Sequence, residues 1–347
     1  MKSSNWFSLI VSIAVLVMVS VSLPVSSQNN TGKPLVKIIA TGGTIANTPT
    51  GRLSIDVVLE EIPGIQDFAD IEIHDYIRVG SASMTLQNWV DIANIITEEL
   101  NKNEQIAGIV VTQGSNTAEE TAYFLHLVLD TDKPVVVVAA QRHRKKLSQD
   151  GSRNLFDAIR VAADPNARNK GVMLVVNELI HSARDVTKTI SYRVDTWESG
   201  DLGVLGFSDL DAIRFYRSPT TRHTANSELQ LNGLTDADEL PDVEIIYSYL
   251  DANPDIVNIA TATGAEGIVV AAFPTGSPGP YTEKLKEIEK KGVSVVLSHR
   301  GGKGRVSIGR DFPSADNLTP QKARILLMLA LYHGKTGSDL DEVFMNY

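Results

Sequence analysis

Two short segments of the sequence place glycines and hydroxyl side chains directly after apolar runs. In the first, residues 40–46 read ATGGTIA, and Thr44 follows the paired glycines Gly42 and Gly43. Glycine lets a backbone turn sharply and approach a ligand closely, which would leave the Thr44 hydroxyl presented on a loop. The same residues are also typical of a tight turn with a capping threonine. This segment alone therefore leaves both interpretations open.

The second segment, residues 112–125, reads TQGSNTAEETAYFL and combines the end of an apolar run, a polar turn and the start of a helix. The positive end of that helix faces the turn, so the Ser115 hydroxyl and the Asn116 amide could hold a carboxylate or an amine. Thr117 and Glu120 have the spacing of a capping box. Ordinary capping explains Thr117 and Asn116, but it does not require Ser115.

Composition excludes several other chemistries. The net charge is −10, from 42 acidic and 32 basic residues, and no basic run occurs that would bind nucleic acid. The sequence has no cysteine, which excludes disulfides and thiol catalysis. Neither GxGxxG nor GxxxxGK[ST] is present, and the GGKG at 301–304 fits neither pattern. We expect no cofactor and no metal site.

Both segments belong to a series of short, β-branched apolar runs separated by stretches of helical spacing. The runs lie at 36–40, 108–112, 135–140 and 172–177, and the helical stretches include 89–100 and 117–129. Such runs predict a parallel sheet with helices on both faces. Ligands bind outside the carboxyl ends of parallel strands, so Thr44 and Ser115 are expected near one another at that edge.

Length and composition favour two domains. Residues 219–241 are rich in Thr, Asn, Gly, Asp and Pro, which predicts a linker. Before it, residues 34–218 form the predicted larger α/β domain with a doubly wound, mostly parallel sheet. After it, residues 242–347 contain three more apolar runs and a closing helix that begins near Pro320, which predicts a smaller α/β domain.

The N-terminal 27 residues have the features of a secretory signal peptide. Lys2 precedes an apolar run at 7–21, and small residues follow Pro24, with a cleavage site expected near Ser27. A retained membrane anchor is the alternative, because the run approaches spanning length. Four serines dilute the segment and favour the signal peptide. We expect a periplasmic or secreted protein with no stable membrane association after cleavage.

Together, ATGGTIA and TQGSNTAEETAYFL closely resemble the paired signatures of bacterial-type L-asparaginases and glutaminase-asparaginases. The likeness spans nearly the whole mature chain in the right order, through 132–137, 150–155, 184–189, 222–224, 240–241 and 320–324. It implies an amidohydrolase that converts L-asparagine, and by extension L-glutamine, to the acid and ammonia through a threonine nucleophile. It also implies a homotetramer built from two tight dimers.

The resemblance also implies roles for single residues. Thr44 matches the threonine nucleophile, Ser115 stands where the family has a second catalytic threonine, and Lys188 matches the lysine that activates it. Taken without the resemblance, Lys188 would be read as a solvated lysine. Ser81 matches a serine that binds the substrate carboxylate. The turns at Gly43 and Gly114 would supply backbone N–H groups for the oxyanion.

Several positions depart from the family pattern. Asn116 stands where the family has an Asp that grips the substrate ammonium, and an amide brings no charge. Charge-assisted hydrogen bonds are about twice as strong as neutral ones, so we expect about 1–3 kcal/mol weaker binding. Ala82 replaces a substrate-contacting glutamine, Gln113 a histidine, and Thr48 the lid tyrosine. In the second domain, FPTGS at 273–277 replaces a Gly/Asn-rich turn.

These observations leave two hypotheses for the function. The first is an amidohydrolase acting on asparagine, with its specificity altered by the replaced residues. The second is an exported binding or remnant protein that keeps the fold but has lost efficient hydrolysis. The retained hydroxyls and lysine favour the enzyme, whereas Asn116 and Thr48 favour the alternative.

Overall fold

The computed structural model describes residues 32–48, 51–309 and 311–347. The segment predicted as a signal peptide or anchor, residues 1–27, lies outside the described residues. Within the described part of the chain, no helix has the length and apolar character needed to cross a membrane.

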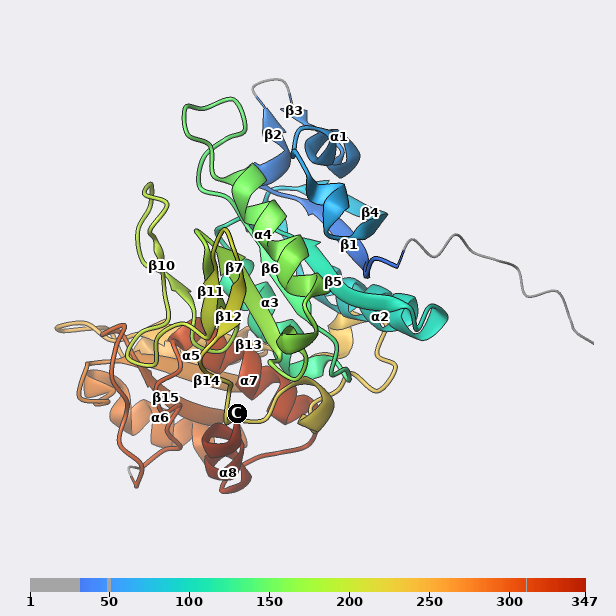
Figure 1. The fold of residues 1–347 in the computed structure, drawn as a ribbon. Helices are drawn as coiled ribbons and strands as arrows, with labels where there is room; N and C mark the ends of the chain where they lie inside the picture. Colours follow the sequence, from blue (N-terminus) through green and yellow to red (C-terminus); the bar gives the residue numbers. More distant parts are fainter. Residues whose placement is uncertain (1–31, 49–50, 310) are drawn as a thin grey trace, which may run out of the picture. The chain divides into compact units, whose positions relative to one another are not determined.

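An eight-stranded sheet forms the larger, N-terminal domain, in the order β12-β11-β8-β7-β6-β5-β1-β4 (Figure 1). Its strands are β1 (Leu35–Gly42), β4 (Asp70–Val79), β5 (Ile106–Thr112), β6 (Val135–Val138), β7 (Val172–Val176), β8 (Leu179–Ser182), β11 (Gly206–Ser208) and β12 (Ile213–Phe215). The five strands from β4 to β7 are parallel, and the last three are antiparallel. The predicted mostly parallel sheet is confirmed.

Helices cover both faces of this sheet. On one face, α2 (Leu86–Lys102) and α3 (Ala118–Val128) share an apolar core with Ile39 and Val111. On the other face, α1 (Ile55–Glu60) and α4 (Gly151–Ala163) share a second core with Ile38 and Val110. Successive side chains of a strand point to opposite faces, so strands buried on both faces read as continuous apolar runs.

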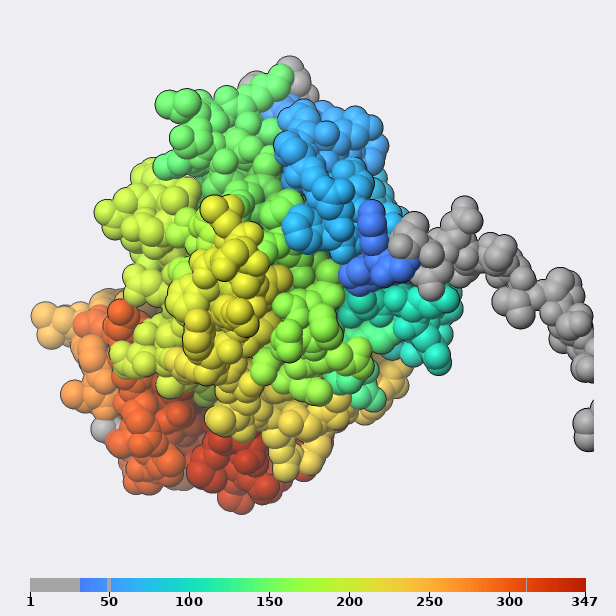
Figure 2. Space-filling model, viewed as in Figure 1, coloured from blue at the N-terminus to red at the C-terminus, as the bar shows by residue number. Residues whose placement is uncertain are grey.

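The smaller, C-terminal domain has a three-stranded parallel sheet of β13 (Val243–Tyr247), β14 (Gly267–Ala272) and β15 (Ser294–His299). Its helices are α5 (Asp255–Ala262), α6 (Thr282–Glu289), α7 (Pro320–Tyr332) and α8 (Asp339–Asn346). The predicted closing helix is confirmed, with Pro320 in its first turn. Helix α7 contacts both this sheet and α3, so one apolar core continues through the two domains. In the space-filling view, the orange and red residues abut the yellow and green ones (Figure 2).

The predicted linker, residues 219–241, packs against the N-terminal helices. It contains the short 3-10 helices η5 (Thr224–Asn226) and η6 (Ala237–Glu239). Leu229, Leu231 and Leu234 are buried, and the Asn94 amide donates to the Leu234 carbonyl at 2.9 Å. The Tyr332 hydroxyl of α7 donates to the Leu231 carbonyl at 3.3 Å, so the segment contacts both domains. The domain limits 34–218 and 242–347 stay predictions.

Two small hairpins and five more 3-10 turns complete the described structure. The hairpins are β2 (Asn47–Thr48) with β3 (Gly51–Arg52), and β9 (Thr187–Lys188) with β10 (Trp197–Glu198). The turns are η1 (Thr44–Ala46), η2 (Ile65–Asp67), η3 (Ser81–Ser83), η4 (Pro165–Ala167) and η7 (Gly279–Tyr281). The first hairpin carries Thr48, and the second carries Lys188.

Candidate active site

The two signature segments leave the sheet side by side. Strands β1 and β5 are paired in parallel, with Ala40 opposite Thr112. Numbered in chain order, the parallel strands β4-β1-β5-β6-β7 run 2-1-3-4-5, so the direction of winding reverses between β1 and β5. Doubly wound sheets bind ligands at this switch point. The loops of Thr44 and Ser115 begin there.

Glycines allow three loops to pack backbone against backbone at this edge. Gly43 has φ 79°, and a Cβ atom there would lie 2.6 Å from the Gly114 nitrogen. A Cβ atom at Gly114 would in turn lie 2.6 Å from the Ser81 Oγ. Real Cβ atoms do not approach other atoms so closely, so any larger residue would push the loops apart. The predicted turns at Gly43 and Gly114 therefore touch each other and the Ser81 loop.

Thr44 begins the 3-10 turn η1, whose N-cap is Gly43 and which has no side-chain cap bond. The interpretation of Thr44 as a capping threonine is therefore wrong. The next two residues, Ile45 and Ala46, are buried and anchor the turn, while Thr44 itself is half-buried. The two buried apolar residues therefore hold the turn, and the Thr44 hydroxyl makes no capping hydrogen bond.

The predicted capping box of Thr117 and Glu120 is also wrong. Thr117 is the N-cap of α3, but its side chain makes no cap bond. Its hydroxyl instead donates to the Ser81 carbonyl at 3.2 Å and accepts from the Gln113 amide at 3.3 Å. Hydrogen bonds to these other partners therefore take the place of the capping bond. Thr117 thereby ties the Ser81 loop to the start of α3.

Ser81 lies against the loop that carries Ser115 and Asn116. It is 6% exposed, and its Oγ accepts the backbone N–H of Asn116 at 3.2 Å. The Asn116 residue itself is exposed, as is Ala82 in the neighbouring loop. The structure thus brings Ser81, Ser115 and Asn116 into one cluster of loops.

Lys188 completes the cluster from the β9–β10 hairpin. Its Nζ donates to the Ser115 Oγ at 2.8 Å, and Ser115 is only 9% exposed. Burial lowers the pKa of Lys188, and the charge of Glu119 opposes that shift. Lys188 is therefore not the solvated lysine that its residue type alone indicates. A hydroxyl bonded to a partly desolvated lysine is an arrangement that can move a proton.

Glu119 also belongs to this cluster, although no sequence pattern singles it out. One carboxylate oxygen accepts the Lys188 backbone N–H at 3.1 Å, and the other accepts the Gln321 amide at 3.0 Å. Its sequence signal is faint: an acidic residue in the first turn of a helix is ordinary. Only the packing of α7 on α3 brings Gln321 to it.

Two of the residues that depart from the family pattern, Gln113 and Thr48, make side-chain hydrogen bonds. Gln113 is fully buried, accepts the Thr41 hydroxyl at 2.8 Å and donates to the Thr121 hydroxyl at 3.0 Å. It therefore links the first signature segment to α3. The Thr48 hydroxyl donates to the Gly51 carbonyl at 2.8 Å, across the β2–β3 hairpin.

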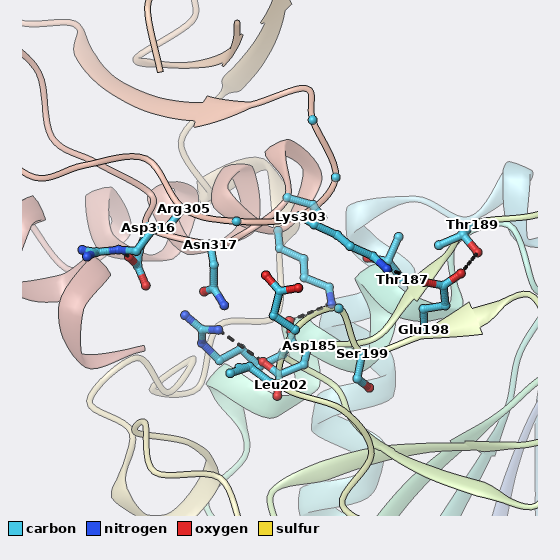
Figure 3. A pocket seen from close by; sticks show the side chains of 18 residues that line it. Asp185, Thr187, Thr189, Glu198, Ser199, Leu202, Lys303, Arg305, Asp316 and Asn317 are labelled. Atoms are coloured by element: carbon cyan, nitrogen blue, oxygen red, sulfur yellow. Dashed lines mark hydrogen bonds and ion pairs between the residues drawn. The ribbon is translucent and has the colours of Figure 1, made fainter. Parts of the chain in front are cut away.

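A cavity of about 660 Å³ lies on the other side of the Lys188 strand, between the β9–β10 hairpin and the C-terminal domain (Figure 3). Thr187 and Thr189, which flank Lys188, line it, together with Glu198 and Lys303, which form an ion pair at 3.0 Å. None of the predicted catalytic or substrate-binding residues lines this cavity. Within the described residues, no group of three or more His, Cys, Asp or Glu side chains is placed to hold a metal ion.

Comparison with known proteins gives the family. An N-terminal asparaginase family model matches residues 35–221, and a glutaminase/asparaginase C-terminal domain model matches residues 242–344. The chain is 37% identical to L-asparaginase 2 of Bacillus subtilis, over 93% of this chain and 89% of that protein. It is 35% identical to the probable periplasmic L-asparaginase of Haemophilus influenzae, over 94% and 96%.

A solved structure agrees with these matches. The crystal structure of a probable cytoplasmic L-asparaginase from Campylobacter jejuni aligns with a TM-score of 0.86 and 39% identity, covering 91% of this chain and all of that one. Fold and sequence together define a two-domain α/β amidohydrolase. The chain belongs to the asparaginase family.

Proposed function

We propose that this protein hydrolyses L-asparagine to L-aspartate and ammonia, with Thr44 as the nucleophile. The observation that carries the proposal is the 2.8 Å bond between Lys188 Nζ and Ser115 Oγ, beside the contact of the Gly43 and Gly114 loops. The names of two relatives support this choice of substrate: the Bacillus protein is called L-asparaginase 2 and the Haemophilus protein a probable L-asparaginase.

In the proposed reaction, the Thr44 oxygen attacks the side-chain amide carbon of asparagine and forms a new C–O bond. The hydroxyl proton passes to the Ser115–Lys188 pair, and the nitrogen leaves as ammonia after gaining a proton. The resulting ester is hydrolysed by water, which releases aspartate and returns the proton to Thr44. Backbone N–H groups at the Gly43 and Gly114 turns would stabilise the oxyanion.

Substrate binding is assigned to Ser81 and Asn116. Ser81 would hold the α-carboxylate, and Asn116 would accept a hydrogen bond from the ammonium through its side-chain carbonyl. The bond from the Asn116 N–H to the Ser81 Oγ keeps the two residues adjacent, as recognition of one amino acid requires. L-glutamine is the expected secondary substrate.

The second candidate function is binding without efficient hydrolysis. The observation that favours it is the exposed, uncharged Asn116, together with Thr48 in place of a lid aromatic. A Thr hydroxyl is far less acidic than a phenol, and its side chain cannot cover a site as a ring does. A binding protein would hold asparagine but release no ammonia.

One assay separates these functions. Ammonia release should be measured with L-asparagine, L-glutamine and their D-forms, on wild type, Thr44→Ala and Ser115→Ala, with calorimetric titration of L-asparagine in parallel. The hydrolase predicts release from L-asparagine that the Thr44→Ala substitution abolishes. Binding heat with no ammonia would favour the binding protein, and activity that survives Thr44→Ala would refute the nucleophile.

We also propose export and assembly into a homotetramer. The apolar run at 7–21 supports a signal peptide, and the relatives include proteins named periplasmic and cytoplasmic. N-terminal sequencing of protein from the native host should find a start within a few residues of Gln28. Intact Met1 in a membrane fraction would favour the anchor. Sedimentation analysis of the purified protein should give the mass of a tetramer.

A further inference from the structure

The first turn of α3 carries two adjacent acidic side chains with different surroundings. Glu119 is 7% exposed and uses both carboxylate oxygens, one for the Lys188 N–H at 3.1 Å and one for the Gln321 amide at 3.0 Å. Glu120 is partly buried and has no such bond to the lysine strand. Of these two acidic residues, Glu119 is therefore the one that joins α3, β9 and α7 through its carboxylate.

The next residue of α7 holds the same strand from a second point. Lys322 is 1% exposed, and its Nζ donates to the carbonyls of Arg184 at 2.8 Å and Val186 at 2.5 Å. These carbonyls lie in the segment that leads into Lys188. Two residues of the C-terminal domain thus fix the backbone around Lys188. Gln321 acts through Glu119, and Lys322 bonds to the backbone directly.

Several charged side chains lie around Lys188, and they differ in which groups they pair with. Arg184 and Asp185, in the segment that precedes it, pair with each other at 3.2 Å. Across the hairpin, Glu198 pairs with Lys303 at 3.0 Å. From α7, Lys322 is bonded to carbonyls, and from α3, Glu120 lies beside Glu119.

Glu119 is the acidic group that acts on Lys188. Among the charged groups around this lysine, its charge is the one that opposes the lowering of the Lys188 pKa by burial. The side chain at 116, next to Ser115, is a neutral amide.

We propose that Glu119 is the positioning residue for Lys188: it fixes the lysine backbone so that Nζ reaches Ser115, and it supplies the negative charge that the amide at 116 does not. The catalytic part of this inference rests on the proposed function, whereas the electrostatic part does not. Glu119 contacts neither Thr44 nor Ser81 through a described hydrogen bond, so its loss should change kcat rather than KM.

The test compares Glu119→Gln with Glu120→Gln as its matched control, in the full protein. Lysine side chains labelled with ¹³C are titrated by NMR, and the Lys188 signal is assigned by its absence in Lys188→Arg. Glu119→Gln should titrate Lys188 at lower pH than wild type, because the opposing charge is gone and the burial remains. Glu120→Gln should leave the Lys188 titration at its wild-type position.

Kinetics give the second readout. At the high-pH plateau, where Lys188 is unprotonated in both proteins, Glu119→Gln should lower kcat for L-asparagine roughly fivefold to tenfold with KM unchanged. The reason is that the bond from the Lys188 backbone N–H to Glu119 becomes a neutral one. Its pH–rate profile should move to lower pH, which a purely structural defect would not cause. Glu120→Gln should keep the wild-type profile.

Three results would overturn the inference: an unshifted Lys188 titration in folded Glu119→Gln, an equal shift in Glu120→Gln, or a loss confined to KM. If Glu119→Gln does not fold, Glu119→Asp and Glu120→Asp replace the pair, and an equal kcat in both would refute the positioning role. A wild-type protein that releases no ammonia would refute the proposed function alone, since the NMR titration judges the charge of Glu119 without turnover.

Discussion

The Nζ of Lys188 donates a hydrogen bond of 2.8 Å to the Oγ of Ser115, joining two residues 73 positions apart in the sequence. The bond connects the β9–β10 hairpin to the loop after β5. Because burial lowers the pKa of Lys188, the lysine can lose its proton at lower pH than an exposed lysine does.

Lys188→Met and Lys188→Arg should both reduce kcat by about 10²–10⁴-fold, because neither side chain can take the proton of a hydroxyl. Wild-type activity should rise with pH through the Lys188 pKa, since the protonated lysine cannot accept a proton. Steady-state kinetics across pH, with circular dichroism as the folding control, would check this. Near-normal activity in Lys188→Arg would mean that the positive charge alone suffices.

Gly43→Ala should disrupt the site where Gly334→Ala does not. Both glycines have positive φ, 79° and 71°, so each alanine brings backbone strain of about 1–3 kcal/mol. The ψ of −173° at Gly43 puts it in a region that essentially only glycine adopts. At Gly43 the new Cβ would also lie 2.6 Å from the Gly114 nitrogen, whereas at Gly334 it meets nothing within 4 Å. We expect about 1–3 kcal/mol further loss in unfolding free energy and little remaining activity for Gly43→Ala only. Equal denaturation midpoints would contradict the tight loop contact.

Asn116→Asp should raise kcat/KM for L-asparagine. If Asn116 holds the substrate ammonium as proposed, a carboxylate there provides a charge-assisted contact of about 1–3 kcal/mol, which corresponds to roughly 5- to 150-fold. Thr44→Ala in the same background should remove the gain, because the proposed nucleophile is missing. A decrease in kcat/KM for Asn116→Asp would mean that the site is shaped for a different ligand.

The sequence predicted the parallel strands better than the edges of the sheet. Strands buried on both faces appear as continuous apolar runs, and those runs matched β1, β5, β6 and β7. Strand β4 was missed because it lies at the edge and carries charged side chains such as Glu72, which pairs with Lys37 at 3.3 Å. Charged side chains on an edge strand prevent pairing with other chains. The same side chains interrupt the apolar run by which a strand is predicted.

The site could be predicted from the sequence only in part, for a related reason. The order of strands places the loops of Thr44 and Ser115 at one edge, so their proximity follows from the apolar pattern. Lys188 lies in a strand of two residues, too short for any periodicity, and only the resemblance singled it out. The bond of Glu119 to Gln321 joins residues 202 positions apart, and no local signal predicts it.

Glu120→Gln should change the pH dependence of stability. Burial, and secondly the charge of Glu119, raise the pKa of Glu120 to about 7 in the folded protein, from 4.5. Between these values the unfolded chain has lost the proton while the folded chain keeps it, so wild-type stability falls as pH rises from about 4.5 to 7.

The glutamine variant should therefore match wild type near pH 4 and exceed it at pH 8 by about 3 kcal/mol of unfolding free energy. Urea denaturation at both pH values measures this difference. Equal stabilities at pH 8 would mean that Glu120 ionises in the fold without cost.

The covalent intermediate offers the most direct test of the proposed reaction. Protein turning over L-asparagine is quenched in acid, digested and analysed by mass spectrometry for a β-aspartyl ester. If Thr44 is the nucleophile, the ester lies on the peptide that carries Thr44 and is absent in Thr44→Ala. An ester on Ser115, or hydrolysis that continues in Thr44→Ala, would contradict the assignment of Thr44 as the nucleophile.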